Sequence, residues 1–356
     1  MTDSAVDRLY LRSAIALAEK GLFSVTMNNP RVGCLLVKNG RVVGRGWHRE
    51  DGGPHAEINA LNNATEDPRD STAYISLEPC CWEGRTSACT TALIDAGIAR
   101  TVIAGRDPHP LVAGGGVRAL SEAGIEVTEE DLSKETQMLN PGPSMRAEHK
   151  RPFVRIKTAI SMDGRTAMAD GQSRWITGEA ARADVQYWRA RSAAIITGVG
   201  TVIADDPMLN VRDQRFGNAE PIRVVVDTRG RTPPKAALFA EKGRIVIACS
   251  KGVEPIDRAE MWELQDGPNV DLPMLLDALS ELGCNEVLVE AGATLNGSFL
   301  EQGLWDEMIV YMAPRLMGDT AKPMAALGFN TMGETVSATV KSIETLGPDI
   351  RIIFTP

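Results

Sequence analysis

A histidine, a glutamate and two cysteines in the first hundred residues have the types and spacing of a catalytic zinc site. Glu57 follows His55 by two positions, and Cys80, which directly follows a proline, precedes Cys89. One imidazole and two thiolates give zinc three protein ligands and leave its fourth position for water. Zinc lowers the pKa of that water toward neutrality, so hydroxide becomes available at pH 7. A glutamate that is not a ligand can move protons between the water and a leaving amine, as in zinc deaminases.

The ligand set is open at one position, because the segment offers Cys80, Cys81 and Cys89. We favour Cys80 and Cys89, since Cys80 directly follows the proline, and we interpret Cys81 as a bystander. The usual motif has two residues between its cysteines, whereas eight separate Cys80 from Cys89. Residues 84–86 among these eight suggest a loop that reaches into the site. The alternative is a structural zinc or ordinary core thiols, but a structural site normally has four protein ligands and no use for Glu57.

Two helix starts are predicted to bring these side chains together. His55 opens an apolar helical pattern directly after a proline, and Cys89 opens a second one. A short buried strand over residues 74–77 ends just ahead of Cys80. Helix N-termini carry partial positive charge, which lowers the pKa of nearby thiols and favours the thiolates that zinc needs.

Two polar residues ahead of the motif are candidates for substrate contact. Asn29 lies where a turn residue would also be placed, so a turn and a ligand role are both open. His48 lies seven residues before His55 in a glycine-bearing loop, and a surface histidine is an equal alternative.

The composition is that of a soluble globular chain with two domains. Its 356 residues exceed one typical core, and its apolar and charged contents of 43% and 24% are ordinary. The chain shows no apolar run of membrane-spanning length and no leader, so we expect a cytoplasmic protein. Six cysteines, three of them clustered, fit a reduced compartment and a metal site. The net charge of −9 argues against a nucleic-acid groove. We therefore expect a small-molecule substrate, no nucleic-acid or membrane partner, and a homo-oligomer.

Alternating helical and strand patterns predict an α/β layered domain in the first half. Apolar residues at helical spacing predict an amphipathic helix over residues 4–20. Asn39 and Gly40 predict a two-residue hairpin turn after an apolar run in which Cys34 is core. Residues 140–143, rich in proline and glycine, are interpreted as a linker, and we place the domain boundary after residue 145.

Buried strands separated by helices predict a mostly parallel sheet in the second half. The strands are expected at residues 153–157, 194–196, 224–227, 245–248 and 287–290. A helix is expected over residues 179–191, with Thr177 as its cap. Residues 292–298 carry glycines between a strand and a helix, where backbone N–H groups can approach phosphate oxygens, although a tight turn is an alternative. The Rossmann fingerprint is incomplete there, so the pattern indicates only an anionic, nucleotide-sized ligand.

Together these motifs resemble the bifunctional deaminase-reductases of riboflavin biosynthesis over nearly the whole chain. In the first half the resemblance rests on residues 29–33, His48, 55–57, 78–80, 84–86, Cys89 and 107–110. In the second half it rests on residues 161–167, 175–177, 204–207 and 290–292. The combination is specific, because two unrelated motif sets occur in the right order on one chain. The chain departs from the family pattern at residues 51–53, 81–83 and 87–88.

The resemblance implies a cytidine-deaminase-like αβα domain in residues 1–145 and a dihydrofolate-reductase-like α/β domain in residues 146–356. The first would use zinc hydroxide to deaminate 2,5-diamino-6-ribosylamino-4(3H)-pyrimidinone 5′-phosphate. The second would reduce the ribosyl group of 5-amino-6-(5-phosphoribosylamino)uracil to ribityl with NADPH. The implied cofactors are one Zn²⁺ and NADPH. No unambiguous 2′-phosphate pocket is visible in the sequence, so NADPH over NADH rests on the resemblance.

The resemblance also implies residue roles. In the deaminase, His55, Cys80 and Cys89 would bind zinc, Glu57 would be catalytic, and Asn29, His48 and Arg85 would contact substrate, Arg85 at its phosphate. In the reductase, the cofactor would meet Ala159, Trp175, Thr201, Asp205, Thr228, Gly292, Ala293, Thr294, Leu295, Asn296, Gly297 and Ser298. The ribose phosphate would be held by Ser173, Arg189, Leu209, Arg212 and Glu290, and Lys157 and Asp205 would position the ribose. Guanidinium groups suit phosphate, although Arg189 on a helix surface and Leu209 in a core are the alternatives.

Two other functions fit parts of the pattern. A nucleoside or transfer-RNA deaminase with an unrelated C-terminal domain is disfavoured by the net charge of −9 and by the second-half motifs. A zinc-stabilised nucleotide-binding module without turnover is disfavoured by Glu57 beside an open zinc position.

Overall fold

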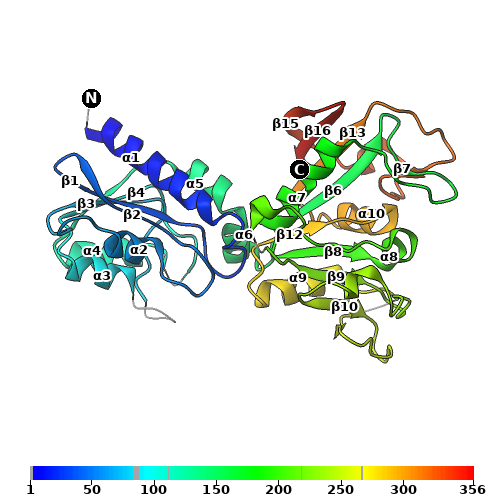
Figure 1. Ribbon diagram of the computed structural model, residues 1–356, viewed down its shortest axis with the longest axis horizontal. Helices are drawn as coiled ribbons and strands as arrows, with labels where there is room; N and C mark the ends of the chain where they lie inside the picture. The colour runs from blue at the N-terminus through cyan, green and yellow to red at the C-terminus, as the bar shows by residue number, and fades with distance from the viewer. Residues whose placement is uncertain (1–2, 83–87, 111, 218, 266–267) are drawn as a thin grey trace. The chain divides into compact units, whose positions relative to one another are not determined.

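The computed structural model describes residues 3–82, 88–110, 112–217, 219–265 and 268–356 (Figure 1). The chain divides into two compact units, Met1–Lys150 and Arg151–Pro356. Each unit has its own sheet and its own hydrophobic core.

The first unit is a helix–sheet–helix sandwich around a five-stranded sheet in the described residues. The strand order is β2-β1-β3-β4-β5, with β1 antiparallel to both neighbours and β3, β4 and β5 parallel. The strands are Gly33–Lys38 (β1), Arg41–Trp47 (β2), Thr72–Ile75 (β3), Arg100–Ile103 (β4) and Glu126–Glu129 (β5). The helices are Asp3–Ala18 (α1), Ala56–Asn62 (α2), Cys89–Asp95 (α3), Gly115–Glu122 (α4), Ser133–Leu139 (α5) and Pro141–His149 (α6). In Figure 1, α1 and α5 cover one face of the sheet, and α2, α3 and α4 cover the other.

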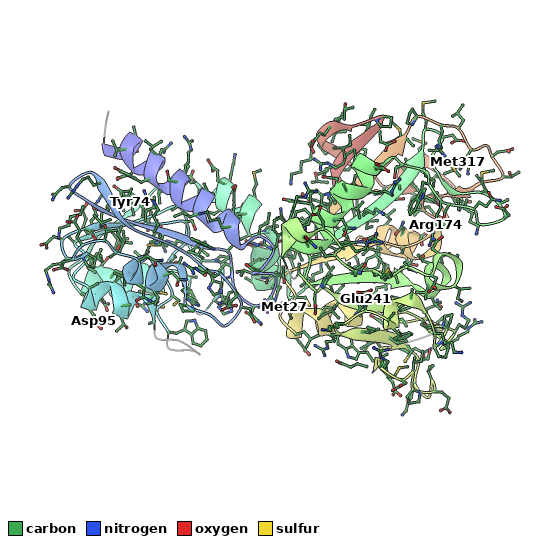
Figure 2. All side chains as sticks on the ribbon, viewed as in Figure 1. Met27, Tyr74, Asp95, Arg174, Glu241 and Met317 are labelled. Atoms are coloured by element: carbon green, nitrogen blue, oxygen red, sulfur yellow. The ribbon has the colours of Figure 1, made fainter. Side chains whose placement is uncertain are left out.

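The hairpin between β1 and β2 is confirmed. Asn39 and Gly40 have φ angles of 50° and 72°, the left-handed backbone that a two-residue turn between twisted strands requires. Cys34 in β1 is fully buried, as predicted. Tyr74, labelled in Figure 2, reaches from β3 to α1, where its hydroxyl donates to Asp7 Oδ1 at 2.8 Å.

Two glycines let helices rest directly on opposite faces of this sheet. A Cβ at Gly33 would lie 2.0 Å from the carbonyl oxygen of Ala14 in α1. A Cβ at Gly46 would lie 2.2 Å from the carbonyl oxygen of Ala56 in α2. Gly46 pairs with Cys34 and shares its face, so Gly33, one residue earlier, faces the other way. The position of α2 on the sheet is therefore set by backbone contact at Gly46.

The predicted linker at residues 140–143 is wrong. Pro141 is instead the first residue of α6, where the missing N–H of a proline removes no helix bond. Asn140 precedes it and exchanges two hydrogen bonds with the backbone of Arg31, at 2.7 and 2.9 Å. A proline thus begins a helix here and does not interrupt the fold.

The second unit is built on a nine-stranded sheet in the described residues, ordered β11-β10-β9-β8-β12-β6-β13-β16-β15. All pairs from β11 to β13 are parallel and the last two pairs are antiparallel, so the prediction of a mostly parallel sheet is confirmed. Its strands are Phe153–Ser161 (β6), Ala194–Gly198 (β8), Ile222–Val226 (β9), Ile245–Cys249 (β10), Glu260–Glu263 (β11), Glu286–Val289 (β12), Glu307–Ala313 (β13), Thr339–Leu346 (β15) and Asp349–Thr355 (β16). Arg165–Ala167 (β7) and Lys322–Pro323 (β14) form a separate pair, and the helices are Glu179–Arg191 (α7), Val199–Asp205 (α8), Leu272–Glu281 (α9) and Ala293–Glu301 (α10).

Helix α7 has the predicted bounds, but the predicted cap is wrong. Gly178 and not Thr177 is the N-cap residue, and its side chain can offer no acceptor. The N–H of Gly178 instead donates to Asp349 Oδ2 at 2.6 Å, so the entry to the helix is held from another strand.

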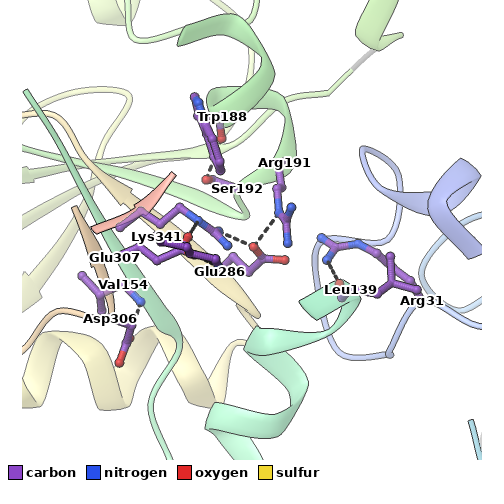
Figure 3. A network of polar contacts seen from close by, with 11 residues as sticks. Arg31, Leu139, Val154, Trp188, Arg191, Ser192, Glu286, Asp306, Glu307 and Lys341 are labelled. Atoms are coloured by element: carbon purple, nitrogen blue, oxygen red, sulfur yellow. Dashed lines mark hydrogen bonds and ion pairs between the residues drawn. The ribbon is translucent and has the colours of Figure 1, made fainter. Parts of the chain in front are cut away.

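A network of charged side chains around two buried carboxylates lies at the amino ends of β12 and β13 (Figure 3). Arg155 donates to Glu286 and, at 2.6 Å, to Glu307. Arg191 donates to Glu286 at 2.8 Å, and Lys341 pairs with Glu307. Each carboxylate therefore has two cationic partners, which offsets the large cost of burying its charge.

Candidate functional site

The structure brings together the three predicted metal ligands. The ligand atoms of His55, Cys80 and Cys89 all lie within 4.8 Å of one another. His55 Nδ1 is 3.5 Å from Cys80 Sγ and 3.3 Å from Cys89 Sγ. Zinc bonds of about 2.0–2.3 Å in a tetrahedron place neighbouring ligand atoms roughly 3.3–3.8 Å apart. One imidazole and two thiols at these separations fit a zinc ion and leave one vertex for another ligand.

Three different elements supply these ligands. His55 is the N-cap residue of α2, Cys89 is the first residue of α3, and Cys80 lies in the loop after β3. The backbone N–H of Cys89 donates to Cys80 Sγ at 3.3 Å. Hydrogen bonds from the Cys89 thiol and from His55 lower the pKa of Cys80 well below that of an ordinary thiol. The site thus favours a thiolate at Cys80, the form that binds metal.

Glu57 lies buried beside these ligands, in the first turn of α2. Burial, followed by the nearby charge of Cys80, raises the pKa of its carboxyl to about 7. The carboxyl is also hydrogen-bonded to the Cys89 thiol. A carboxyl with this pKa can take up and release a proton near neutral pH, as a general acid and base must.

Asn29 and His48 both contact the ring of His55. The Asn29 side-chain nitrogen is 3.1 Å from His48 Nε2 and 3.3 Å from His55 Nε2. The His48 ring stands edge-on to the His55 ring, with centroids 5.2 Å apart. His48 is only 2% exposed, so the alternative of a surface histidine is wrong. Burial lowers the pKa of His48, which favours its neutral form. Arg85 and residues 84–86 lie outside the described residues.

In the second unit, several predicted cofactor residues meet where strands end and helices begin. Thr201, in the first turn of α8, accepts a hydrogen bond through Oγ1 from the N–H of Gly292 at 3.2 Å. Gly292 is the N-cap residue of α10. Thr228 lies two residues after the end of β9, and its Oγ1 accepts a hydrogen bond from the N–H of Val270 at 3.4 Å. Carboxyl ends of parallel strands are where sheets of this kind bind ligands.

Ser173 and Asp205, two further predicted residues, are hydrogen-bonded to each other. Ser173 Oγ donates to Asp205 Oδ1 at 2.8 Å. Trp175 is 61% exposed, and the Arg182 guanidinium lies 4.4 Å from its ring centroid. Ala159 lies on β6. An exposed indole can stack against a flat ligand ring.

A buried ion cluster joins three predicted substrate residues. Arg189 Nε and Nη2 donate to the two oxygens of Glu290 at 2.6 and 3.0 Å, and Lys157 Nζ is 3.4 Å from Glu290 Oε2. Burial alone would raise the pKa of Glu290, but the charges of Arg189 and Lys157 prevail and lower it to about 2. Arg189 is therefore an interior residue, and the alternative of a helix-surface arginine is wrong.

The other predicted residues of the second unit differ in how much of each is exposed. Leu209 is 2% exposed and has a φ of 51°, so its side chain belongs to the core, as the alternative held. Asn296 and Gly297 are buried, and the Asn296 amide donates to two backbone carbonyls at 3.1 Å each. Arg212 is exposed, and its backbone N–H donates to Gln186 Oε1 at 2.8 Å. In residues 292–298, Gly292 and Thr294 are the exposed members.

Sequence reasoning missed two groups near these sites. The carbonyl of Asn210 accepts a hydrogen bond from Arg189 Nη1 at 3.0 Å, and no side-chain pattern identifies a backbone acceptor. Glu78 is buried and accepts three backbone hydrogen bonds. The motif at residues 78–80 includes Glu78 but indicates no role for it, and the remaining signal is an acidic residue directly after a predicted buried strand.

Two protein-family models match the chain. The cytidine and deoxycytidylate deaminase zinc-binding region matches residues 4–105, and the RibD C-terminal domain matches residues 152–352. The expected fold classes of the two domains are therefore confirmed. Within the part of the chain that the structure describes, each helix is too short or too polar to cross a membrane.

Relatives match the chain from end to end. The riboflavin biosynthesis protein RibD of Haemophilus influenzae is 40% identical, over 99% of this chain and 98% of that protein. RibD of Escherichia coli is also 40% identical, over 97% and 98%. Among solved structures, Acinetobacter baumannii RibD in form 1 has a TM-score of 0.92 and 41% identity, over 99% of both chains. A diaminohydroxyphosphoribosylaminopyrimidine deaminase/5-amino-6-(5-phosphoribosylamino)uracil reductase from Thermotoga maritima has a TM-score of 0.90 and 31% identity, over 99% of both chains.

Proposed function

Because the chain belongs to the RibD family of bifunctional riboflavin-biosynthesis enzymes, we propose that its first unit is the deaminase and its second unit the reductase. The deaminase substrate is 2,5-diamino-6-ribosylamino-4(3H)-pyrimidinone 5′-phosphate, and the reductase acts on 5-amino-6-(5-phosphoribosylamino)uracil. The observation that supports the deaminase assignment is that three ligand atoms lie within 4.8 Å of one another beside a buried glutamate. That the chain forms a homo-oligomer stays a prediction. A measurement of its molar mass in solution by light scattering would test it.

In the deaminase, His55, Cys80 and Cys89 hold the metal and Glu57 moves protons. When bound, zinc supplies a water activated for attack at neutral pH. Glu57 would move a proton between the attacking water and the leaving amine, because a carboxyl with a pKa of about 7 can take up and release a proton near neutral pH. Asn29 lies against His55 and offers an amide donor and acceptor to the pyrimidine ring. Buried His48 contacts the Asn29 amide and holds it in place.

Two neighbouring cysteines provide a matched test of the deaminase. Cys80→Ser is expected to lose zinc and ammonia release, because one of three protein ligands is gone. Cys81→Ser is expected to keep both, because Cys81 lies outside the group of three ligand atoms in the described residues. Zinc content and ammonia release are measured on both variants, together with NADPH oxidation on substrate that is already deaminated. Equal zinc loss in the two variants would refute the ligand assignment.

In the reductase, the buried cluster of Lys157, Arg189 and Glu290 suits a phosphorylated ribose. Two cations and one carboxylate leave a net charge of +1 for the phosphate. Thr201 and Gly292 lie at the starts of α8 and α10, where backbone N–H groups can meet the phosphates of a dinucleotide. The hydride comes from the cofactor, and the protein orients it against the ribosyl group.

From the side chains of the loop after β9, we propose that this cofactor is NADPH. An acidic residue at a strand end binds the ribose 2′-hydroxyl in NAD-dependent proteins. Here Asp227 is fully buried, and its Oδ2 accepts hydrogen bonds from Thr232 N at 2.6 Å and Thr232 Oγ1 at 2.7 Å. Arg229 and Arg231 on the same loop are exposed and can meet a 2′-phosphate. The KM for NADPH is expected to be at least about tenfold below that for NADH, and equal values would contradict the proposal.

A further inference from the structure

The buried carboxylate of Glu78 links two parts of the first unit that are far apart in the sequence. Glu78 is 3% exposed and lies two positions before Cys80. Its Oε2 accepts hydrogen bonds from the N–H groups of Asp107 at 3.3 Å and Gly114 at 3.0 Å. Its Oε1 accepts a hydrogen bond from the N–H of Val117 at 3.1 Å.

These donors mark the end of one element and the start of another. Asp107 follows β4, while Gly114 is the N-cap residue of α4 and Val117 lies in its first turn. The first N–H groups of a helix have no partner within the helix, and the helix start carries partial positive charge. One carboxylate therefore caps α4 and also accepts a hydrogen bond from the loop that follows β4.

Two glycines place the start of α4 directly on the segment that carries the zinc ligand. A Cβ at Gly116 would lie 2.2 Å from the carbonyl oxygen of Pro79. A Cβ at Gly115 would lie 2.6 Å from Cys81 Sγ. Pro79 and Cys81 are the two neighbours of Cys80 in the chain, so α4 contacts the backbone on one side of this ligand and the Cys81 side chain on the other.

We propose that Glu78 is a positioning residue of the deaminase, which holds α4 against Pro79 and Cys81 and so fixes Cys80 where it can share an ion with His55 and Cys89. The inference rests on the proposed deaminase site. Metal sites tolerate ligand displacements of only about 0.2 Å, and the loss of groups that orient a ligand costs about 10–100-fold in metal affinity or activity. Glu78 would act at this level, through Cys80, without touching metal or substrate.

Glu78→Gln tests the proposal on the full-length protein. The amide removes the negative charge and replaces one acceptor oxygen by a donor that faces backbone N–H groups. The zinc Kd, measured by competition with a chelator, is expected to rise by about 10–100-fold. The absorption bands of the Co²⁺-loaded protein, which report thiolate coordination, are expected to weaken and shift. NADPH oxidation on substrate that is already deaminated should not change.

Glu129→Gln is the matched control. Glu129 pairs with Arg106, one residue before Asp107, at 2.8 and 2.9 Å, and is exposed to solvent. Its loss removes an ion pair from the same stretch of chain, and it removes none of the three hydrogen bonds that Glu78 accepts. Its zinc Kd and Co²⁺ bands are expected to match those of the unsubstituted protein.

Glu78→Asp is the second variant, for the case that Glu78→Gln does not fold. It keeps the charge but is one methylene shorter, so it can reach fewer of the three donors, and an intermediate rise in zinc Kd is expected. A lower unfolding temperature with unchanged zinc Kd and Co²⁺ bands, in whichever variant folds, would make Glu78 a structural cap and overturn the proposal. If the unsubstituted protein binds zinc but releases no ammonia, the proposed deaminase fails instead, and the effect of Glu78 on zinc Kd is still measured.

Discussion

The contact between α2 and the sheet at Gly46 predicts how far the zinc site can be disturbed from a distance. In Gly46→Ala, the new Cβ would lie 2.2 Å from the carbonyl oxygen of Ala56 and 2.3 Å from the N atom of Ala60. Ordinary contact begins at 3.4 Å, so the backbone of α2 has to move by about 1.2 Å, the difference between 3.4 Å and 2.2 Å. His55 and Glu57 stand at the start of this helix and would move with it.

A shift of this size exceeds the tolerance of a metal site. Ligand distances have to hold within about 0.2 Å, and Cys80 and Cys89 lie outside α2, in the loop after β3 and at the start of α3. We therefore expect the zinc Kd of Gly46→Ala to rise by at least about tenfold, with a matching loss of ammonia release. The chain should still fold, because the helix can lift as a unit.

Gly33→Ala separates this effect from a general loss of stability. Its Cβ would lie 2.0 Å from the carbonyl oxygen of Ala14, an equally tight contact, but with α1 on the opposite face of the sheet. Both variants are expected to unfold at lower temperature, and only Gly46→Ala should lose zinc affinity. Chelator competition and thermal unfolding are measured on both. Retained zinc affinity in Gly46→Ala, with a drop in unfolding temperature like that of Gly33→Ala, would refute the reasoning.

Three further outcomes are expected. Glu57→Gln should keep zinc, because Glu57 is not a ligand, and should lose ammonia release by about 10²–10⁴-fold; a rate above a tenth of the original would exclude the proton-transfer role. Removal of zinc with a chelator should abolish ammonia release and spare NADPH oxidation on deaminated substrate, because all three ligands lie in the first unit; joint loss of both activities would show coupling. Glu290, whose pKa falls from 4.5 to about 2 on folding, should contribute about 3 kcal/mol that is fully present above pH 4.5 and lost as the pH falls toward 2. Urea unfolding at a series of pH values should show this loss in the unsubstituted protein and much less of it in Glu290→Gln, and identical pH profiles would contradict it.

The zinc motif could be predicted from the sequence because its residues are linked by local rules. His55 and Glu57 are two positions apart at one helix start, and Cys89 begins another, so spacing alone indicates a shared metal. The hydrogen bonds of Glu78, which lie next to the motif, could not be predicted in this way. The three N–H groups that bind Glu78 come from residues about 30 to 40 positions later, and spacing does not encode such contacts.

The second unit shows the same division. Apolar runs predicted its strands, because a parallel sheet covered on both faces needs continuous hydrophobic segments. Whether a polar or apolar residue on a helix or loop points inward was not predictable, and Arg189 proved to be buried against Glu290. The linker prediction failed at Pro141, because a proline signals both the end of one element and the first residue of a helix.

The network of Arg155, Glu286 and Glu307 lies at the amino ends of strands whose carboxyl ends carry Glu290 and the start of α10. The charged residues that anchor the second unit are thus separated, along the strands, from those proposed to meet ligands. Mutational drift or laboratory evolution can remodel cofactor preference at one end while the anchoring charges stay unchanged. At the amino ends of the strands, a single substitution in the network leaves a buried charge without its partner. Acceptable changes there therefore have to come as compensated pairs.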